Sequence, residues 1–199
     1  MTIRYSTVGI VGTGAMGRGI AQIAAQAGST VQLFDLNPEA CRQAHAAITA
    51  QWDKLQDKGR IDAATADAYK TRLQTAASLG DLHNCDLVVE AAVERLDIKQ
   101  SLFAQLEDIV RPDAVLVTNT SSLSVTAIAA GLKRPAQFAG YHFFNPVPLM
   151  KVVEVIAGLK TDAAVCAGLT EYARQMGHTP VQAQDTPGFI VNHAGRAYG

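Results

Sequence analysis

The feature that most constrains the fold is a glycine-rich turn near the start of the chain, TVGIVGTGAMGRG at residues 7–19. Its β-branched residues predict a short buried strand, and Gly12, Gly14 and Gly17 follow with G-x-G-x-x-G spacing where a helix begins. The first glycine of such a turn allows a tight bend, the second lets backbone approach a pyrophosphate, and the third lets helix and strand pack closely. The helix N-terminus then presents unpaired N–H groups to the anion. The segment predicts a dinucleotide-binding turn.

The residues after this turn complete a strand–helix–strand unit. A helix is expected over about residues 15–27, ending at Gly28, and residues 30–34 predict a second strand that closes on Asp35. Asp35 lies 18 residues after Gly17, where folds of this kind place the acid that accepts hydrogen bonds from the adenosine ribose. The alternative is an ordinary α/β turn in which Asp35 merely begins a loop.

The residues around Asp35 also indicate which dinucleotide is bound. A carboxylate at this position repels a 2′-phosphate, and Leu36 and Asn37 provide no arginine that would reverse the preference. We therefore predict that the cofactor is NAD rather than NADP.

Composition argues against several classes of function. The chain has 199 residues, of which 48% are hydrophobic and 18% charged, and its formal net charge is -1. A nucleic-acid surface needs a clustered basic face, which this balance does not favour. No apolar run approaches the roughly 18 residues that cross a bilayer, and the chain enters its first strand without a signal peptide. We expect a cytoplasmic protein. Cys41, Cys85 and Cys166 form no C-x-x-C pair, which predicts buried side chains rather than a disulfide or a metal site.

The remaining pattern predicts an α/β fold with a doubly wound, mostly parallel Rossmann-type sheet. Further strands are expected at residues 86–92, 114–118, 137–142, 151–156 and 178–182, with helices at about 96–110 and 161–176. Between the second and third of the predicted strands lies a helical hairpin insertion. Its first helix opens at Asn37-Pro38 and ends at Gly59, and its second covers about residues 62–73.

The hairpin carries basic residues that admit two interpretations. Lys54, Lys58 and Arg60 could meet the phosphates of a substrate. Acidic residues are interleaved with them, namely Asp53, Asp57 and Asp62. Mixed charge of this kind is usual on a solvated helix face.

Polar residues gather where the predicted strands end. Residues 119–122, Asn-Thr-Ser-Ser, follow one strand at the edge where open α/β sheets bind ligands. Ser121 could face a cleft there, while Ser122 or Ser124 could cap the following helical segment.

A histidine and a glutamate stand out on two later strands. His142 ends the strand 137–142, and Glu154 is the single acid within the apolar strand 151–156. A carboxylate in such a setting costs several kcal/mol unless it is paired, and His142 is the nearest partner in sequence. The pair could hold the imidazole in one tautomer as a general base, or it could be purely structural.

Several stretches together resemble the L-3-hydroxyacyl-CoA dehydrogenase family, including its 3-hydroxybutyryl-CoA and 3-hydroxyadipyl-CoA dehydrogenase branches. The resemblance covers all 199 residues and is carried by GIVGTGAMGRGIA, VVEAAVERLDIK, TNTSSLS, GYHFFNPVPLMKVVEVI and DTPGFIVN. It implies an oxidoreductase that converts an L-3-hydroxyacyl-CoA to the 3-oxoacyl-CoA, with hydride transfer to NAD, as in fatty-acid β-oxidation.

The same resemblance assigns roles to individual residues. It implies that His142 and Glu154 form the catalytic dyad, with Ser121 and Asn192 contacting the reacting part of the substrate. The residues expected to contact NAD are Gly12, Gly14, Ala15, Met16, Gly17, Asp35, Glu94, Lys99, Ser121 and Asn145, the last four at its nicotinamide end. The expected substrate is an acyl-CoA thioester, with Ser121, Asn192 and Lys58 as its candidate contacts.

Members of that family also carry a second, all-helical domain that usually forms a dimer. We therefore expect an NAD-binding Rossmann domain at residues 1–186 and the first turns of a truncated helical domain at 187–199, from a parent that is a homodimer. His193 stands where the family usually has arginine.

Three other functions differ from this one in the residues that they require. A gulonate-type dehydrogenase of free hydroxy acids would use the same histidine. An NAD-binding module, or a fragment without turnover, would need no dyad. The β-hydroxyacid dehydrogenases place a catalytic lysine on a glycine-studded helix, and the sequence shows no such helix.

Overall fold

The computed structural model describes residues 2–186 and residue 189. These residues form an eight-stranded sheet in the order β3-β2-β1-β4-β5-β6-β7-β8. Neighbouring strands run parallel except for β6 and β7, which are antiparallel. The strands are β1 (Thr7–Val11), β2 (Thr30–Phe34), β3 (Leu73–Thr75), β4 (Leu87–Glu90), β5 (Val115–Thr118), β6 (Phe138–Phe143), β7 (Val152–Ala157) and β8 (Thr179–Gln184). The predicted fold class is confirmed.

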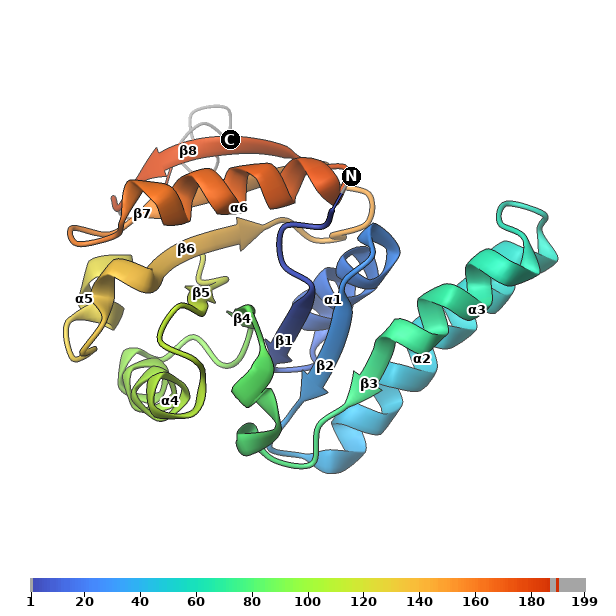
Figure 1. Ribbon diagram of the computed structural model, residues 1–199, viewed down its shortest axis with the longest axis horizontal. Helices are drawn as coiled ribbons and strands as arrows, with labels where there is room; N and C mark the ends of the chain where they lie inside the picture. Colours follow the sequence, from blue (N-terminus) through green and yellow to red (C-terminus); the bar gives the residue numbers. More distant parts are fainter. Residues whose placement is uncertain (1, 187–188, 190–199) are drawn as a thin grey trace, which may run out of the picture.

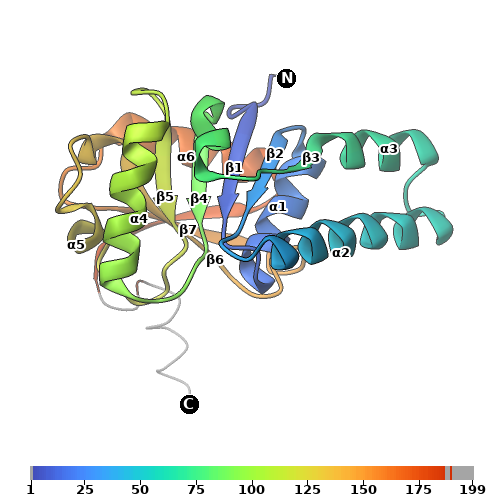
Figure 2. The same cartoon turned by 90° about the horizontal axis from the view of Figure 1, so that it is seen from below.

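Helices cover both faces of the sheet (Figure 1, Figure 2). They are α1 (Ala15–Ala27), α2 (Pro38–Asp57), α3 (Ala63–Arg72), α4 (Leu96–Ile109), α5 (Val125–Ala129) and α6 (Ala163–Gln175), with 3-10 turns at η1 (Leu79–Asn84) and η2 (Pro135–Gln137). Side chains of α1, α2 and α6 share one hydrophobic core with one face of the sheet. Side chains of η1, α4 and α5 share a second core with the other face.

The central strands are apolar because both of their faces are covered. On β4, Val88 faces the second core while Leu87 and Val89 face the first, and all three are at most 1% exposed. Parallel strands buried on both sides read as continuous apolar runs rather than as an alternation. This explains why these strands were recognisable from the sequence.

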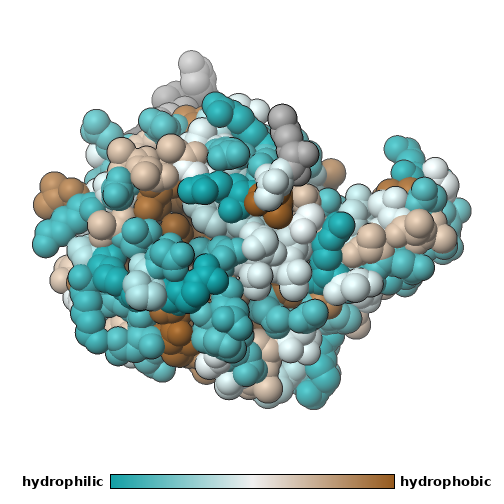
Figure 3. Space-filling view, viewed as in Figure 1, coloured by the Kyte–Doolittle hydropathy of each residue, from teal (hydrophilic) through white to brown (hydrophobic). Residues whose placement is uncertain are grey.

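The predicted insertion after the second strand is present as a hairpin of α2 and α3 that projects from the sheet (Figure 1). Asn37 caps α2 through a 3.0 Å hydrogen bond from the N–H of Glu39, and Pro38 occupies its first turn. Trp52 is fully buried between the helices, with its ring centroid 5.6 Å from that of Tyr69. Hydrophilic residues cover much of the projecting surface (Figure 3).

The structure differs from the sequence prediction at an edge strand and at the end of the last strand. The second hairpin helix ends at Arg72, and residues 73–75 form the edge strand β3, which was not predicted. Three residues are too few to show a period, and what holds β3 is its pairing with β2, where Leu73 lies opposite Val31. The last strand also runs further than predicted, to Gln184.

Two further observations concern membrane-spanning helices and the C-terminal residues. Among the described residues, no helix combines the length and the apolar character that crossing a membrane requires. The expected helical segment at residues 187–199, apart from Phe189, lies outside the residues that the structure describes, and so do Asn192 and His193.

Candidate active site

The glycine turn joins β1 to α1 at the carboxyl edge of the sheet and is too tight for side chains at two of its positions. Gly12 has φ +94°, and a Cβ there would lie 2.6 Å from the carbonyl oxygen of Ala91. A Cβ on Gly17 would lie 1.8 Å from the carbonyl oxygen of Gly12. A Cβ on Gly14 would meet no atom within 4 Å. Gly14 therefore borders open space, as expected of the glycine that a pyrophosphate approaches.

Asp35 lies directly after β2, and its carboxylate is fixed against the turn. The N–H and the hydroxyl of Thr13 donate to Oδ2 of Asp35 at 2.8 and 2.9 Å, and the N–H of Asn37 donates to Oδ1 at 3.0 Å. Partial burial raises the pKa of Asp35, but the hydrogen bonds from Asn37 and Thr13 outweigh it and hold the pKa below its ordinary value. The group is a carboxylate at neutral pH and can accept hydrogen bonds from ribose hydroxyls.

A cavity of about 720 Å³ lies beside this carboxylate. Its wall includes Gly12, Gly14, Asp35, Leu36, Ile98 and Leu102. The wall combines the carboxylate of Asp35 with apolar side chains such as Ile98 and Leu102, a combination that suits a ribose and an adenine ring. The residues present therefore fit the adenosine half of a dinucleotide.

Asp35→Ser is expected to weaken binding of NADH by about tenfold and to reduce the preference for NADH over NADPH, because two charge-assisted hydrogen bonds are lost and a 2′-phosphate is no longer repelled. Fluorescence titration with each reduced cofactor checks both effects. An unchanged preference would show that Asp35 takes no part in selecting the cofactor.

A second cavity of about 340 Å³ shares Ala91 and Ala92 with the first. Six residues predicted from the sequence lie on its wall, namely Met16, Glu94, Lys99, Ser121, His142 and Asn145. They come from α1, the loop after β4, α4, the loop after β5, β6 and the loop after β6. The fold thus gathers at one place residues that lie more than a hundred positions apart in the sequence.

His142 and Glu154 are direct partners in the antiparallel pairing of β6 with β7. Nδ1 of His142 is 2.7 Å from Oε2 of Glu154, and the two residues are 5% and 0% exposed. A carboxylate can only accept, so Nδ1 carries the proton and Nε2 is left to take up another. The rings of Phe144 and Phe189 lie 4.5 and 5.7 Å from the imidazole, centroid to centroid. This arrangement can serve as an oriented general base.

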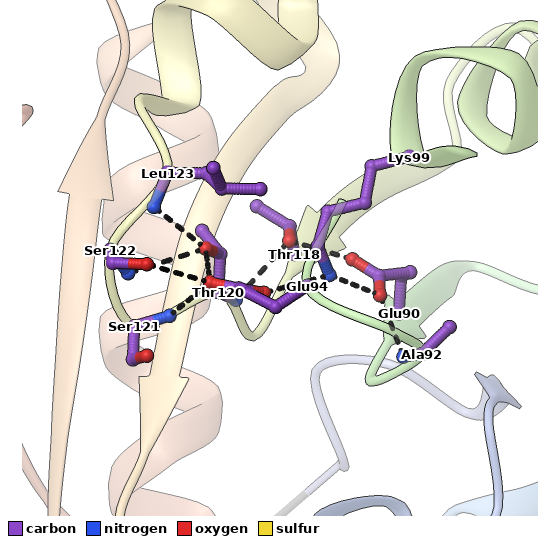
Figure 4. A network of polar contacts seen from close by, with 9 residues as sticks. All are labelled: Glu90, Ala92, Glu94, Lys99, Thr118, Thr120, Ser121, Ser122 and Leu123. Atoms are coloured by element: carbon purple, nitrogen blue, oxygen red, sulfur yellow. Dashed lines mark hydrogen bonds and ion pairs between the residues drawn. The ribbon is translucent and has the colours of Figure 1, made fainter. Parts of the chain in front are cut away.

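The turn after β5 is held by Glu94 (Figure 4). Oε1 of Glu94 accepts hydrogen bonds from the hydroxyl of Thr120, the N–H of Ser121 and the hydroxyl of Ser122. Partial burial raises the pKa of Glu94, but the hydrogen bond from Thr120 and the charge of Lys99 bring it below its ordinary value. Glu94 is therefore ionised and fixes the turn that carries Ser121 on the cavity wall.

The two predicted roles of the serines fall on different residues. Ser124 caps α5, since its hydroxyl accepts a hydrogen bond from the N–H of Ala127 at 3.1 Å. Ser121 lines the second cavity instead.

Two polar residues behind the site, Glu90 and Thr118, were not predicted from the sequence, whereas Asn119 belongs to the predicted polar segment and lies on the wall of the second cavity. Glu90 and Thr118 are fully buried and hydrogen-bonded to each other at 2.7 Å. Asn119 accepts a 2.9 Å hydrogen bond from the N–H of Phe143 and so ties β5 to β6. Glu90 could have been found, because it is a lone acid at the end of an apolar strand, the signal that drew attention to Glu154.

Two predicted substrate contacts are not placed at the site. Lys58 is exposed at the C-terminal end of α2. The hairpin of α2 and α3 extends away from the sheet (Figure 1). Asn192 lies outside the described residues.

The fold, the glycine turn and the carboxylate of Asp35 define a Rossmann-type dinucleotide-binding domain. Residues 7–186 match the family model described as 3-hydroxyacyl-CoA dehydrogenase, NAD binding domain. The chain belongs to this family, which confirms the resemblance seen in the sequence and the prediction of NAD.

Individual relatives agree with this assignment. The 3-hydroxyadipyl-CoA dehydrogenase of Escherichia coli K12 is 46% identical over 198 residues, which are 100% of this chain and 42% of that protein. A probable 3-hydroxybutyryl-CoA dehydrogenase of Deinococcus radiodurans is 45% identical over 187 residues, 92% of this chain and 66% of that protein. The crystal structure of 3-hydroxybutyryl-CoA dehydrogenase from Escherichia coli K12 superposes with a TM-score of 0.95 at 44% identity, covering 100% of this chain and 42% of that chain. The chain therefore spans between two fifths and two thirds of these relatives.

Proposed function

We propose that this chain is the cofactor-binding and proton-transferring part of an NAD-dependent L-3-hydroxyacyl-CoA dehydrogenase. One observation carries the proposal: the His142–Glu154 pair faces a cavity that shares Ala91 and Ala92 with the cavity of the glycine turn. An acid–base group beside a dinucleotide site suits the oxidation of an alcohol, in which a proton and a hydride leave together.

Each residue of the site has a separate proposed role in this reaction. When bound, NAD supplies the acceptor for the hydride that leaves C3 of the substrate. Nε2 of His142 takes the proton of the 3-hydroxyl group and returns it in the reverse direction. Glu154 stabilises the imidazolium through Nδ1. Ser121 and Asn192 are proposed to position the substrate oxygens, so that only a productive geometry is bound.

The proposal extends to the organisation of the whole protein. Residues 1–186 are proposed as the NAD-binding domain and residues 187–199 as the start of a helical domain, since the family match ends at residue 186. A homodimeric parent is proposed from the resemblance alone. A cytoplasmic location is proposed because NAD and CoA thioesters are intracellular compounds.

The direct test mixes the 199-residue chain with NADH and acetoacetyl-CoA and follows the nicotinamide absorbance. We expect oxidation of NADH that His142→Ala abolishes and that His83→Ala, a change at an exposed histidine on η1, leaves intact. Turnover that survives His142→Ala would exclude this base.

Two further outcomes separate the alternatives. A sugar acid oxidised faster than a 3-hydroxyacyl-CoA would favour a gulonate-type dehydrogenase. Binding of NADH without turnover of either substrate would make this chain a cofactor-binding fragment.

Lys58 is proposed to contact the phosphates of CoA. In the same assay Lys58→Ala should raise the KM for acetoacetyl-CoA several-fold and leave kcat unchanged, because a rim charge contributes to binding in the ground state and the transition state alike. Asp53 pairs with Lys70 at 2.5 Å on the same hairpin, so its surface charges are partly compensated. An unchanged KM would assign Lys58 to a solvated helix face.

A further inference from the structure

A row of alternating charges runs from the second cavity into the protein interior. Glu94 has 38% of its side chain exposed, Lys99 has 1% and Glu90 has 0%. Nζ of Lys99 lies 3.3 Å from Oε2 of Glu94 and 2.6 Å from Oε1 of Glu90. Figure 4 shows the ammonium group between the two carboxyl groups. We refer to Glu90, Lys99 and Glu94 as the charged triad.

Glu90 has the hydrogen-bond partners of a buried carboxylate. Oε1 accepts from Nζ of Lys99 at 2.6 Å and from the N–H of Ala92 at 2.7 Å, and Oε2 accepts from the hydroxyl of Thr118 at 2.7 Å. All three partners donate, and an ionised carboxyl group only accepts. Glu90 therefore ties together the end of β5, the loop after β4 and helix α4 without reaching the cavity itself.

The triad carries a net charge of about -1, because two carboxylates face one ammonium group. Among the ion pairs of the described residues, Lys99 is the sole cation that contacts either carboxylate. Among the described residues on the wall of the second cavity, His142 is the one titratable side chain besides Glu94 and Lys99, and Glu154 lies behind it. Buried charges act over a longer range than exposed ones, since water screens them less.

The oxidised and reduced forms of NAD differ in charge at the ring that reacts. The oxidised nicotinamide ring carries one positive charge, and the reduced ring carries none. A negative group near this ring favours the oxidised form, and the difference in affinity grows as the surroundings become less polar.

We propose that Glu90 sets the ratio of the affinities for NAD and NADH through the net charge of the triad, without contacting the cofactor. This inference rests on the proposed function, in which the nicotinamide end binds in the second cavity. Glu90 keeps the triad negative by neutralising the ammonium group that would otherwise cancel the charge of Glu94. This role is electrostatic, and a charge acts through space, so Glu90 need not touch the reacting atoms.

The variant Glu90→Gln tests this charge with little change of shape. The amide oxygen can still accept from Lys99 and Ala92, and the amide nitrogen can donate to the hydroxyl oxygen of Thr118. The triad becomes neutral. We expect the affinity for NAD to fall relative to that for NADH by about tenfold, the order of magnitude for two unit charges about 12 Å apart at an effective dielectric constant of about 20. A tenfold change in this ratio equals about 30 mV in the potential of the bound two-electron couple.

Two further variants separate charge from structure. Glu90→Gln combined with Lys99→Met removes the buried ion pair and leaves Glu94 as the single charge, so the net charge returns to about -1 and the ratio should return toward that of the unaltered chain. Glu107→Gln is the matched control. It replaces a buried glutamate on α4, which accepts hydrogen bonds from the N–H groups of Lys133 and Arg134 and does not contact the triad.

The measurement is the dissociation constant of NADH by fluorescence and that of NAD by competition, at one pH, on the 199-residue chain. The inference is supported if the affinity for NAD, divided by the affinity for NADH, falls in Glu90→Gln and recovers in the double variant. An unchanged ratio in Glu90→Gln, or a fall that the double variant does not reverse, overturns it. If Glu90→Gln does not fold, Glu94→Gln makes the same change of charge and must lower the ratio too. Failure of the unaltered chain to bind either form would instead remove the proposed function, and the inference with it.

Discussion

Replacing Gly17 by alanine is expected to weaken binding of NADH more than a hundredfold. The added Cβ would lie 1.8 Å from the carbonyl oxygen of Gly12, which is backbone and cannot rotate away. Either α1 or the turn must therefore move, and both form the cradle for the pyrophosphate. We also expect the free energy of unfolding to fall by about 2–3 kcal/mol, as is typical of overpacked sites.

Gly14→Ala is the matched comparison for this prediction. A Cβ on Gly14 meets no atom within 4 Å, and its φ of -65° suits any residue, so stability should stay within about 0.5 kcal/mol. Affinity for NADH should nevertheless fall, because the methyl group occupies the space into which the pyrophosphate fits. Chemical denaturation and NADH titration of both variants test the pair. Equal affinities in Gly14→Ala and the unaltered chain would place the pyrophosphate elsewhere.

Glu154→Gln is expected to reduce kcat for acetoacetyl-CoA about 10²–10³-fold while the affinity for NADH changes little. An amide can still hydrogen-bond to Nδ1 of His142, but it can present its N–H₂ group and favour the wrong tautomer, and it does not stabilise the imidazolium. Glu154 is fully buried, so water cannot take over its role.

The readouts for this second prediction are steady-state kinetics and NADH titration on the same preparation. Glu107→Gln again serves as the control for loss of a buried glutamate. Parallel losses of NADH affinity and of kcat would show that Glu154 only holds the fold together. A normal kcat would remove the dyad from the mechanism.

The sequence was most informative where one residue type has few structural roles. The glycine spacing and Asp35 predicted the turn, and the structure gives steric reasons at Gly12 and Gly17. The apolar runs predicted the central strands because those strands are covered on both faces. The lone Glu154 predicted a buried partner, and the structure supplies His142 at 2.7 Å.

What could not be predicted depends on contacts between distant segments. The edge strand β3 exists through its pairing with β2, and nothing within its three residues shows it. The hydrogen bond between Glu90 and Thr118 joins two strands that are 28 residues apart in sequence. The hydrogen bonds that Glu94 accepts from Thr120 and Ser122 likewise join residues that are 26 and 28 positions apart.

The antiparallel pairing of β6 with β7 has a consequence for how such proteins can diversify. His142 and Glu154 face each other because they are paired within the ladder of β6 and β7, which runs from Gly140 opposite Ile156 to Phe143 opposite Val153, whereas residues 144–151 of the joining loop lie outside that ladder. Exchanges in this loop can reshape the wall of the second cavity, to which Phe144 and Asn145 contribute, while the proposed proton-transferring pair stays in place. The loop can thus change with the substrate while β6 and β7 keep the two side chains opposite each other. Substrate choice and proton transfer would then be encoded by neighbouring segments that can change separately.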